Sequence, residues 1–401
     1  MGERRGITIV PNLFQKLAPS IAAASIIDFG IACSPAKKNK KLYLDAFHRA
    51  RGAKILPFAS YAMPINYPSG IISEHLHTRK FASLFDITHM GQAFLRGKKA
   101  SHFMESLVPG NIISLSPQKM KYTMLTNDRG GIIDDIMITN LGEYLFVVVN
   151  GSVKDSVFNY ITRQSIAGVD LDVQSERVML SLQGPLAQNV LARVFPQVKA
   201  MLFMSAQQYI FEGVNCVVSR SGYSGEDGFE ISMPFEIAEQ FIKLIEAEPE
   251  VSMAGLGARD SLRLEAGLCL FGSDVDENIT PVEARLDWSI SERRRKYGGF
   301  PGDKIILDQI VHGVRKKRIG IRPLGRAPAR AHTEIQSIKN QNIGIVTSGG
   351  FGPTINGPLA MGYVNSEFSE PDTDINLIVR GRSLRAKVVQ LPFVRHQYVK
   401  R

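Results

Sequence analysis

Short runs of apolar residues, separated by turns rich in Gly, Asn and Pro, dominate the chain beyond residue 42. Three consecutive runs occupy Lys121–Thr126, Ile132–Thr139 and Glu143–Val149, and they are joined by residues 127–131 and 140–142. Short apolar runs connected by Asn- and Gly-containing turns are typical of β-hairpins. This part of the chain is therefore predicted to form an antiparallel meander.

The C-terminal part, from Lys317 onward, also alternates between strand-like runs and Gly/Pro turns. The expected strands are Ile343–Ser348, Ala360–Val364, Ile375–Arg380 and Leu384–Gln390. Short strands that follow one another in this way suit a small closed sheet. We expect a small all-β barrel at the C-terminus.

Two segments show the period of helices. Phe235–Glu248 is amphipathic and stops before Pro249, with an apolar stripe made of Ile237, Phe241, Leu244 and Ile245. Ala258–Ala266 is followed by Gly267, and glycine commonly ends a helix. A few helices among many short strands predict an α+β protein with mostly antiparallel sheets.

Composition and charge narrow the class of protein. The 401 residues are enough for two to three domains, and 44% hydrophobic with 21% charged residues is typical of globular proteins. The net charge of +10 is concentrated, because residues 1–41 carry seven basic and two acidic residues and residues 291–330 carry twelve and three. Basicity confined to one tail and one patch, without interleaved aromatic residues, does not predict nucleic-acid binding.

Residues 1–41 differ from the rest and are expected to form a poorly ordered extension, so that the first domain begins near Leu42. Asp28 interrupts their apolar run, which argues against a signal peptide. The basic residues gather late in this segment, which makes it a poor transit peptide. We therefore expect a cytoplasmic protein, with the mitochondrial matrix as the alternative. No apolar run reaches the ~18–20 residues of a membrane span, so no membrane association is expected.

Several familiar chemistries find no support in the sequence. The chain has no Walker A motif, GLGARD at 255–260 lacks the third glycine of a dinucleotide site, and GYSGE at 222–226 is not a nucleophile elbow. The three cysteines form no CxxC pair: Cys33, Cys216 and Cys269. Three histidines lack metal-binding spacing and are expected to be core or hydrogen-bonding residues: His75, His77 and His89. We expect no metal and no nicotinamide cofactor.

Two adjacent carboxylates, Asp134 and Asp135, interrupt an apolar strand. Neighbouring strand residues point to opposite faces, so only one of the pair can face an interior site. Alternation does not decide which one, because both faces carry Ile. A carboxylate in an apolar strand is costly unless it is hydrogen-bonded or functional. A solvated pair at a sheet edge explains the sequence equally well.

Two further segments contain groups that could bind a flat heterocycle. The glycines of RSGYSGEDGFEI at 220–231 allow a tight turn, and Glu230 with Tyr223 could accept adjacent N–H donors. Arg259 and Arg263 lie four residues apart on one helix face, where one or both could hold a carboxylate or a ring oxygen. An acidic surface turn and a helix stabilised by ion pairs, such as Asp260 with Arg263, are the simpler alternatives.

Together and in this order, these segments resemble the aminomethyltransferase of the glycine cleavage system, the T-protein family. The resemblance rests on GYSGEDGFE at 222–230 and ARDSLRLEAG at 258–267. It extends to EHLHTR, LFDITHMG, LQGP, TPVE, FPG and AMGYV at residues 74–79, 84–91, 182–185, 280–283, 300–302 and 360–364. It runs from about Leu42 to the C-terminus, and residues 1–41 lie outside it.

The resemblance implies three domains arranged as a cloverleaf around a central channel that holds tetrahydrofolate. Residues 42–90 with 176–273 would form the first domain, and residues 91–175 with 274–310 the second, interleaved with it. Residues 311–401 would form the C-terminal β-barrel. The implied reaction takes an aminomethyl group from the dihydrolipoyl arm of the H-protein, releases ammonia and converts tetrahydrofolate to 5,10-methylenetetrahydrofolate.

The resemblance also assigns residues. The catalytic carboxylate would be Asp135, the second Asp of the family's GGxxDD motif, which would manage protons and stabilise an iminium-like intermediate. Glu230 would hold the pterin edge, and Tyr223 and Arg259 would line the folate pocket. Tyr398 matches a C-terminal folate contact, in a stretch that varies more than the others.

Asn150 matches a further position, but the residues after it depart from the family pattern. Family members usually read Val-Asn-Ala-Gly, whereas this chain has Val149-Asn150-Gly151-Ser152. A role of this turn in binding the folate tail is therefore in doubt.

Lipoylated H-protein, usually acidic, is the expected partner, and the basic patch is a candidate surface for it or for the polyglutamate tail of folate. The patch comprises Arg293, Arg294, Arg295 and Lys296, followed by residues 315–318. A solvated face that binds nothing explains it equally well. Two alternative functions remain: a tetrahydrofolate-dependent demethylase on the same fold, and a non-enzymatic folate-binding protein. About 360 residues leave no room for an additional flavin domain.

Overall fold

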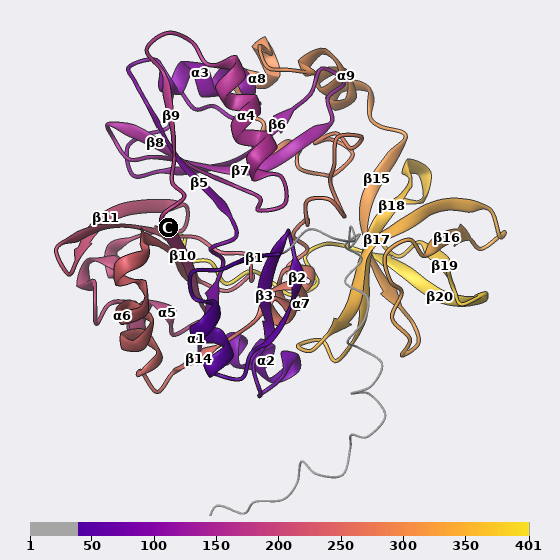
Figure 1. Cartoon of the computed structure of the whole chain (residues 1–401). Helices are drawn as coiled ribbons and strands as arrows, with labels where there is room; N and C mark the ends of the chain where they lie inside the picture. Colours follow the sequence, from indigo (N-terminus) through magenta and orange to yellow (C-terminus); the bar gives the residue numbers. More distant parts are fainter. Residues whose placement is uncertain (1–38, 401) are drawn as a thin grey trace, which may run out of the picture. The chain divides into compact units, whose positions relative to one another are not determined.

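The computed structural model describes residues 39–400, whose strands form four β-sheets (Figure 1). Most strand pairs are antiparallel. Two pairs are parallel: β1 (Lys40–Lys41) with β3 (Tyr61–Asn66), and β14 (Val251–Met253) with β4 (Ala82–Asp86). The predicted α+β class with mostly antiparallel sheets is confirmed.

A small sheet begins the described part, in the order β1-β3-β2, with β2 at Lys54–Phe58. Along the chain, helix α1 (Asp45–Ala50) lies between β1 and β2, and helix α2 (Ile71–Lys80) follows β3. Strand β1 lies inside the segment that was predicted to be a poorly ordered extension, so for Lys40 and Lys41 that prediction is wrong. Their backbones pair with β3. Residues 1–38 lie outside the described residues.

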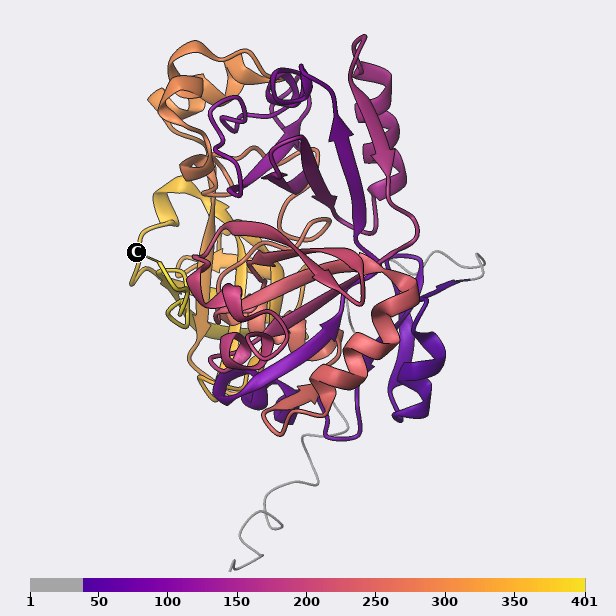
Figure 2. The ribbon, with the colours of Figure 1, turned by 90° about the vertical axis from the view of Figure 1, so that its left-hand side faces the viewer.

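The second sheet has six strands in the order β11-β12-β13-β10-β4-β14. Its remaining strands are β10 (Arg177–Gln183), β11 (Ser205–Phe211), β12 (Val214–Arg220) and β13 (Gly228–Pro234). The helices α5 (Ala187–Leu191) and α6 (Phe235–Glu246) pack against one face, and the 3-10 turn η1 (Pro196–Ala200) follows α5 (Figure 2).

Helix α6 confirms the amphipathic prediction, with one correction. Ile237, Phe241 and Ile245 are buried in the core between α6 and the sheet, together with Ala238 and Ile242. Leu244, which was predicted on the same stripe, is 44% exposed. The stripe runs along positions separated by three and four residues, and Leu244 lies three after Phe241 but at the edge of that stripe.

The third sheet contains the predicted meander. It has the order β6-β7-β8-β5-β9, formed by β5 (Gly91–Arg96), β6 (Met120–Thr126), β7 (Ile132–Asn140), β8 (Tyr144–Val149) and β9 (Asp170–Val173). The pairs β6–β7 and β7–β8 are antiparallel, as expected from the sequence. The helices α3 (Ala100–Leu107) and α4 (Lys154–Gln164) close an apolar core on one side of this sheet.

The second and third sheets face each other across a shared apolar cluster. Phe85 and Met179 from the six-stranded sheet pack there with Phe94 and Phe146 from the five-stranded one. Leu262 of helix α7 (Leu256–Glu265) joins them. Each of these two sheets thus has helices on one face and its neighbour on the other. This packing brings the ends of β7 and β8 close to the loop between β12 and β13.

The C-terminal strands close into the predicted barrel, in the order β15-β18-β17-β16-β19-β20. They are β15 (Lys316–Pro323), β16 (Glu334–Ser337), β17 (Asn342–Gly352), β18 (Gly357–Asn365), β19 (Asp374–Val379) and β20 (Arg382–Val389), with the turn η3 (Ser366–Phe368) after β18. Strand β16 was not predicted, because it is short, half polar and interrupted by a bulge against β17.

Helix α7 (Leu256–Glu265) is central to the arrangement, since it packs against α2, β3, β17 and β18. The segment that follows carries the 3-10 turn η2 (Asp287–Ser289) and the helices α8 (Glu292–Tyr297) and α9 (Asp303–His312). The five-stranded sheet comes entirely from residues between β4 and β10, which supports the interleaved partition. The exact domain boundaries given above stay a proposal.

Candidate functional site

The carboxylates Asp134 and Asp135 meet at the amide of Asn150, which follows β8. The Asn150 side chain donates to Oδ1 of Asp134 and to Oδ1 of Asp135, each at 2.8 Å, and its backbone N–H donates to Oδ2 of Asp134 at 3.1 Å. Strand β7 lies between β6 and β8 in the sheet. The alternative of a solvated pair at a sheet edge is therefore wrong.

The structure also resolves which carboxylate faces which side. Asp134 is fully buried and lies on the same face of β7 as Ile136 and Ile138. Both isoleucines belong to the apolar core that α3 and α4 cover. Asp135 keeps partial exposure, and the Tyr122 hydroxyl on β6 donates to its Oδ2 at 3.1 Å. The side chain that can reach a ligand is thus Asp135.

Neither carboxylate forms a salt bridge with any residue between 39 and 400. Burial raises the pKa of the Asp134 carboxyl from 3.8 to about 8, and the neighbouring charge of Asp135 adds to the shift. Burial also raises the pKa of Asp135, while hydrogen bonds from Tyr122 and Asn150 oppose that rise. Because two adjacent carboxylates resist being ionised together, the pair takes up a proton more readily than an isolated carboxyl does.

An aromatic pair stands beside this cluster. The ring of Tyr122 stacks on the indole of Trp288 in η2, with centroids 5.6 Å apart and planes inclined by 17°. Burial raises the pKa of the Tyr122 hydroxyl well above 10, and the charge of the neighbouring Asp135 and the hydrogen bond to it add to that rise. Tyr122 therefore remains a neutral donor to Asp135.

The glycine-rich loop between β12 and β13 wraps around the side chain of Gln183. A Cβ at Gly222 would lie 1.9 Å from Oε1 of Gln183, and one at Gly228 would lie 2.5 Å from its Nε2. Gln183 donates to the Ser221 carbonyl and accepts from the Ser224 hydroxyl. The glycines are thus required for space, and the loop that carries Tyr223 has a defined shape.

Tyr223 and Arg259 lie together, whereas Arg263 turns away. The Arg259 guanidinium lies 4.9 Å from the centroid of the Tyr223 ring, and Tyr223 donates its hydroxyl hydrogen to the Cys269 carbonyl. Arg259 makes no side-chain hydrogen bond or salt bridge with the described residues. Glu230 accepts one hydrogen bond, from the Ser221 hydroxyl at 2.9 Å, and its charge acts on Arg259.

The two clusters share one electrostatic environment. Burial raises the pKa of Tyr223, and the charge of Asp135 adds to that rise. Both Tyr223 and Cys269 act on Tyr122 in the same direction. The structure therefore brings Asp135, Asn150, Tyr223 and Arg259 into one region, with Glu230 beside Arg259.

Tyr398 does not contact the other predicted site residues and packs elsewhere. Its ring stacks on Phe203, with centroids 3.9 Å apart, and no contact joins it to the other predicted site residues within the described part. The C-terminal segment is held by backbone bonds from Gln397 to Gly225 and from Val394 to Glu265. It thus approaches the glycine-rich loop from the outside.

The turn after Asn150 has a physical reason for its departure from the family pattern. A Cβ at Gly151 would lie 2.6 Å from the His89 carbonyl oxygen and 2.8 Å from its ring. His89 itself is buried, and burial beside Arg259 lowers its pKa to about 3. Alanine at position 151 would collide with His89, so glycine keeps the Asn150 turn close.

Family models match most of the chain. Residues 44–294 match the model described as the GCVT N-terminal domain, and residues 316–395 match the glycine cleavage T-protein C-terminal barrel domain. The chain belongs to the glycine cleavage T-protein family.

Several curated and solved relatives of this T-protein support the assignment. The mitochondrial aminomethyltransferase of Flaveria anomala is 42% identical over 371 residues, which cover 90% of this chain and 91% of the relative. That of Dictyostelium discoideum is 41% identical, covering 92% and 95%. The crystal structure of glycine cleavage system aminomethyltransferase T from Bartonella henselae superposes with a TM-score of 0.87 at 38% identity, covering 90% of this chain and all of that one.

The basic patch of the T-protein is largely occupied by internal contacts. Arg293 is paired with the buried Glu105, and Arg294 donates to the carbonyls of Glu105, Val108 and Gly299. Arg295 contacts Asp287 and the Ile290 carbonyl. Only Lys296 among these four residues has no ion pair within residues 39–400. The patch therefore serves first to attach α8 to α3 and η2.

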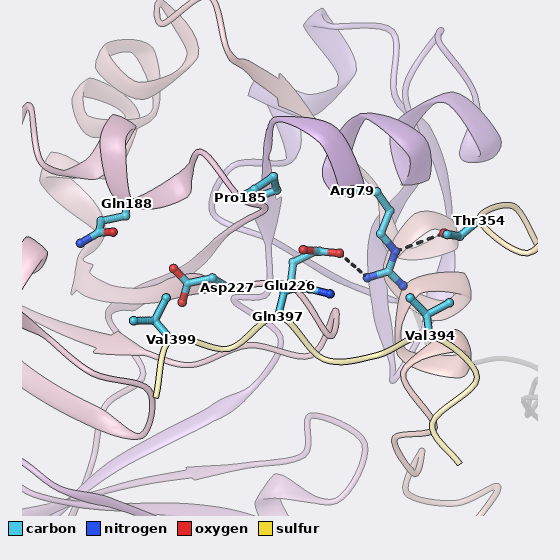
Figure 3. A pocket seen from close by; sticks show the side chains of 9 residues that line it. All are labelled: Arg79, Pro185, Gln188, Glu226, Asp227, Thr354, Val394, Gln397 and Val399. Carbon is cyan, nitrogen blue, oxygen red and sulfur yellow. Dashed lines mark hydrogen bonds and ion pairs between the residues drawn. The ribbon is translucent and has the colours of Figure 1, made fainter. Parts of the chain in front are cut away.

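A cavity of about 530 Å³ lies beside the C-terminal segment, and none of the six predicted site residues lines it (Figure 3). Arg79 points from α2 toward Glu226 and Thr354, and it also pairs with Glu265. The other lining residues are Pro185, Gln188, Asp227, Val394, Gln397 and Val399. Because Arg79 is committed to these partners, the cavity wall acts as a junction between α2, α7 and the glycine-rich loop.

Sequence reasoning missed Tyr122, Trp288 and Gln183 as parts of the T-protein site. Tyr122 and Trp288 lie on separate segments, and no local spacing relates them. Gln183 belongs to the LQGP motif, and the glycines that pack against it, Gly222 and Gly228, belong to the glycine-rich motif. The presence of both motifs in the sequence was the available signal. No group of three or more His, Cys, Asp or Glu side chains in residues 39–400 is arranged to hold a metal ion, and no helix there is long and apolar enough to cross a membrane.

Proposed function

We propose that this chain transfers the one-carbon unit of an aminomethyl group from a dihydrolipoyl arm to tetrahydrofolate, with Asp135 as the catalytic carboxylate. The enzyme class follows from the family, since the curated relatives are aminomethyltransferases and the chain spans nearly their whole length. The chain is an aminomethyltransferase of the glycine cleavage system.

The proposal for Asp135 rests on one observation: its carboxylate is partly exposed and forms no salt bridge with any described residue. Asp135 receives neutral donors from Tyr122 and Asn150, which orient it without cancelling its charge. An ionised carboxylate in a partly buried site stabilises positive charge that develops at a reacting carbon. It can also accept protons from the two folate nitrogens as their bonds to the carbon form; the original carbon–nitrogen and carbon–sulfur bonds break, and those protons end on the departing ammonia and on the dihydrolipoyl thiol.

The donor and acceptor set on the other side fits the edge of a reduced pterin. Glu230 has a carboxylate oxygen without a partner among the described residues, which suits ring N–H and amino donors. The Arg259 guanidinium, held over Tyr223 and free of ion pairs, suits a ring carbonyl oxygen or the folate carboxylates. Tetrahydrofolate, when bound, supplies the nucleophilic nitrogens; these residues orient it toward Asp135.

Asn150 and Tyr398 receive different roles. Asn150 donates hydrogen bonds to Asp134 and Asp135, and we assign it the role of positioning these carboxylates rather than of binding folate. Tyr398, which is stacked on Phe203 in the segment held against Gly225, would close over the folate after the loop residues have bound it.

The amine carrier is proposed to be the lipoylated H-protein. Because three of the four arginine and lysine residues at 293–296 are already paired, we assign them mainly to the fold and leave Lys296 as the one free cation of that group among the described residues. The curated relatives are named mitochondrial, which favours the mitochondrial matrix over the cytoplasm. A fluorescent fusion at the C-terminus that remains diffuse in the cytoplasm would contradict this location.

The test is ammonia release from aminomethylated, lipoylated H-protein, measured with and without tetrahydrofolate. We expect folate to accelerate release strongly and methylenetetrahydrofolate to appear at the same rate. If no ammonia is released above background while folate still binds, the folate pocket would be supported and the aminomethylated H-protein would be ruled out as the donor. A screen of methylated amines would then test the demethylase alternative, and failure of that screen would leave a folate-binding protein.

A further inference from the structure

Trp288 is the single tryptophan of the chain and one of its most exposed large apolar side chains, at 63%. One face of its indole rests on Tyr122, whose hydroxyl reaches Asp135. Only the Tyr122 side chain separates this exposed tryptophan from the proposed catalytic carboxylate. The exposure needs an explanation, because exposed aromatic surface is costly and tends to mark binding sites.

The turn that presents the indole is held in place. Arg295 of α8 donates to the backbone and side chain of Asp287 and to the Ile290 carbonyl, on both sides of Trp288. The Ser289 hydroxyl closes the turn through the Leu286 carbonyl. The backbone of η2 is therefore fixed, and the exposure of Trp288 follows from that geometry and not from a loose loop.

We infer that Trp288 and Tyr122 form an aromatic wall against which the saturated hydrocarbon part of the carrier's dihydrolipoyl arm packs as its aminomethyl end reaches Asp135. This inference rests on the proposed function and names the surface that binds the arm. Trp288 is a substrate-binding residue in this assignment, and it takes no part in proton transfer.

The chemistry around Trp288 favours a hydrocarbon chain over the folate ring. Asp287, the adjacent acidic residue, is paired with Arg295, so the surface next to the indole carries little free charge. The polar groups suited to a pterin, Glu230 and Arg259, gather instead around Tyr223. An apolar arm gains from burial against an aromatic face without any hydrogen bond.

The first experiment compares Trp288→Ala and Trp288→Phe with Tyr297→Ala in steady-state ammonia release. Tyr297 is the matched control, since it is 69% exposed and close in sequence but has no contact with Tyr122 or Asp135. We expect Trp288→Ala to raise KM for aminomethylated H-protein roughly tenfold, a factor that corresponds to about 1.4 kcal/mol. Trp288→Phe should recover most of the loss, and Tyr297→Ala should behave as wild type.

Equilibrium dialysis of tetrahydrofolate separates the two candidate occupants. Unchanged folate affinity in Trp288→Ala supports the arm, whereas a matching loss of folate affinity overturns it and assigns the wall to the pterin. An unchanged KM in a folded variant also overturns it. Wild-type enzyme that releases no ammonia would instead contradict the proposed function itself, so the two failures are distinguishable.

Fluorescence gives a second measurement that does not depend on turnover. Trp288 is the only source of tryptophan emission in this chain. Dihydrolipoamide alone, titrated into the wild-type enzyme, should shift the emission to shorter wavelength as the indole loses water. No shift at saturating dihydrolipoamide, together with an unchanged KM in Trp288→Ala, would remove the inference.

Discussion

Two buried acidic sites in this T-protein differ in how their charge is compensated. Asp274 is fully buried and accepts hydrogen bonds from Arg263, Ser348 and the Leu270 backbone, and the Arg263 contact is a salt bridge of 2.8 Å. The Asp134–Asp135 pair is also enclosed but receives only neutral donors. The first site stabilises the contact between α7 and the barrel, whereas the second keeps an uncompensated charge.

The difference shows how to separate structural from functional carboxylates. A buried charge that is fully paired has little left to offer a substrate, and removing one partner mainly destabilises the fold. A carboxylate with a raised pKa and no cation retains both its charge and its capacity to exchange protons. The same contrast separates Arg263, which is paired twice, from Arg259, which is paired with nothing described.

The largest expected effect is on turnover in Asp135→Asn. The variant keeps the shape of the side chain but loses its charge, so we expect kcat to fall roughly 10²–10⁴-fold. Folate affinity should change little, because Glu230 and Arg259 remain. Measurement of ammonia release beside folate dialysis checks both statements. Wild-type turnover in this variant would remove the assignment of Asp135.

Asp274→Asn should show the opposite pattern. The variant removes one of the two carboxylates that pair with the buried Arg263. Because Asp260 still pairs with it, we expect a loss of unfolding free energy below the roughly 3–5 kcal/mol of a fully broken buried pair. Urea unfolding measures the loss, and activity per folded molecule should remain close to wild type. If Asp274→Asn lost turnover without losing stability, the distinction between the two acidic sites would be wrong.

Arg259→Gln tests the unpaired cation on the folate side. Losing a hydrogen bond to a charged group costs about 1.5–3 kcal/mol, so folate affinity should fall by roughly one to two orders of magnitude. The melting temperature should stay within a few degrees of wild type, since Arg259 makes no side-chain hydrogen bond or ion pair with the described residues and contacts only the face of Tyr223 through its charge. A strongly destabilised variant with normal folate affinity would make Arg259 a structural residue.

Asp134→Asn should change the pH dependence more than the rate. The proposed role of Asp135 requires its ionised form, and its pKa is raised, so the wild-type rate should fall with decreasing pH at values above 3.8. Asp134 keeps its proton until about pH 8, and its ionisation places a second negative charge beside Asp135. We expect a second change in the wild-type profile near that pH.

In Asp134→Asn the change near pH 8 should be absent. The unfolding free energy of the wild type should also decrease as pH rises. The pKa of Asp134 is higher in the folded than in the unfolded chain, so its favourable contribution at low pH is lost as pH rises toward about 8. The variant should therefore show a smaller decline of unfolding free energy over that range. Identical profiles for both proteins would assign the alkaline change to another group.

The smallest expected effect concerns the basic patch. Arg293→Gln breaks a partly exposed pair with Glu105 and should cost about 1 kcal/mol of stability, with little effect on KM for H-protein. Lys296→Gln should leave stability unchanged and raise that KM modestly at low salt, since Lys296 has no ion pair in the described structure. A salt-dependent KM change in Arg293→Gln alone would restore the arginines as the docking surface.

Local patterns were sufficient for much of the fold. The meander, the C-terminal barrel and the amphipathic helix at Phe235 follow from short-range alternation, turn residues and helix-ending residues, each of which acts within a few positions of the chain. Strand β16 and the exposed Leu244 were mispredicted because a bulge and the edge of an apolar stripe depend on neighbours that are distant in sequence.

The site was determined by the sequence only as a set of candidates. The motifs indicated Asp135, Tyr223, Glu230 and Arg259. The residues alone, however, left an edge pair equally open and made a surface turn and an ion-paired helix the simpler alternatives. The tertiary structure decided which carboxylate is accessible, because that depends on the register of β7 between β6 and β8 and on the arrival of Asn150.

The same reasoning applies to the charged residues. Arg259 and Arg263 are equivalent in the sequence, yet only Arg263 meets Asp274, and the arginines at 293–295 meet Glu105 and Asp287 instead of solvent. Local backbone structure arises from interactions between near neighbours, which a sequence displays directly. The partner of a charge, and therefore its freedom to act on a substrate, arises from packing between distant segments, which only the folded chain brings together.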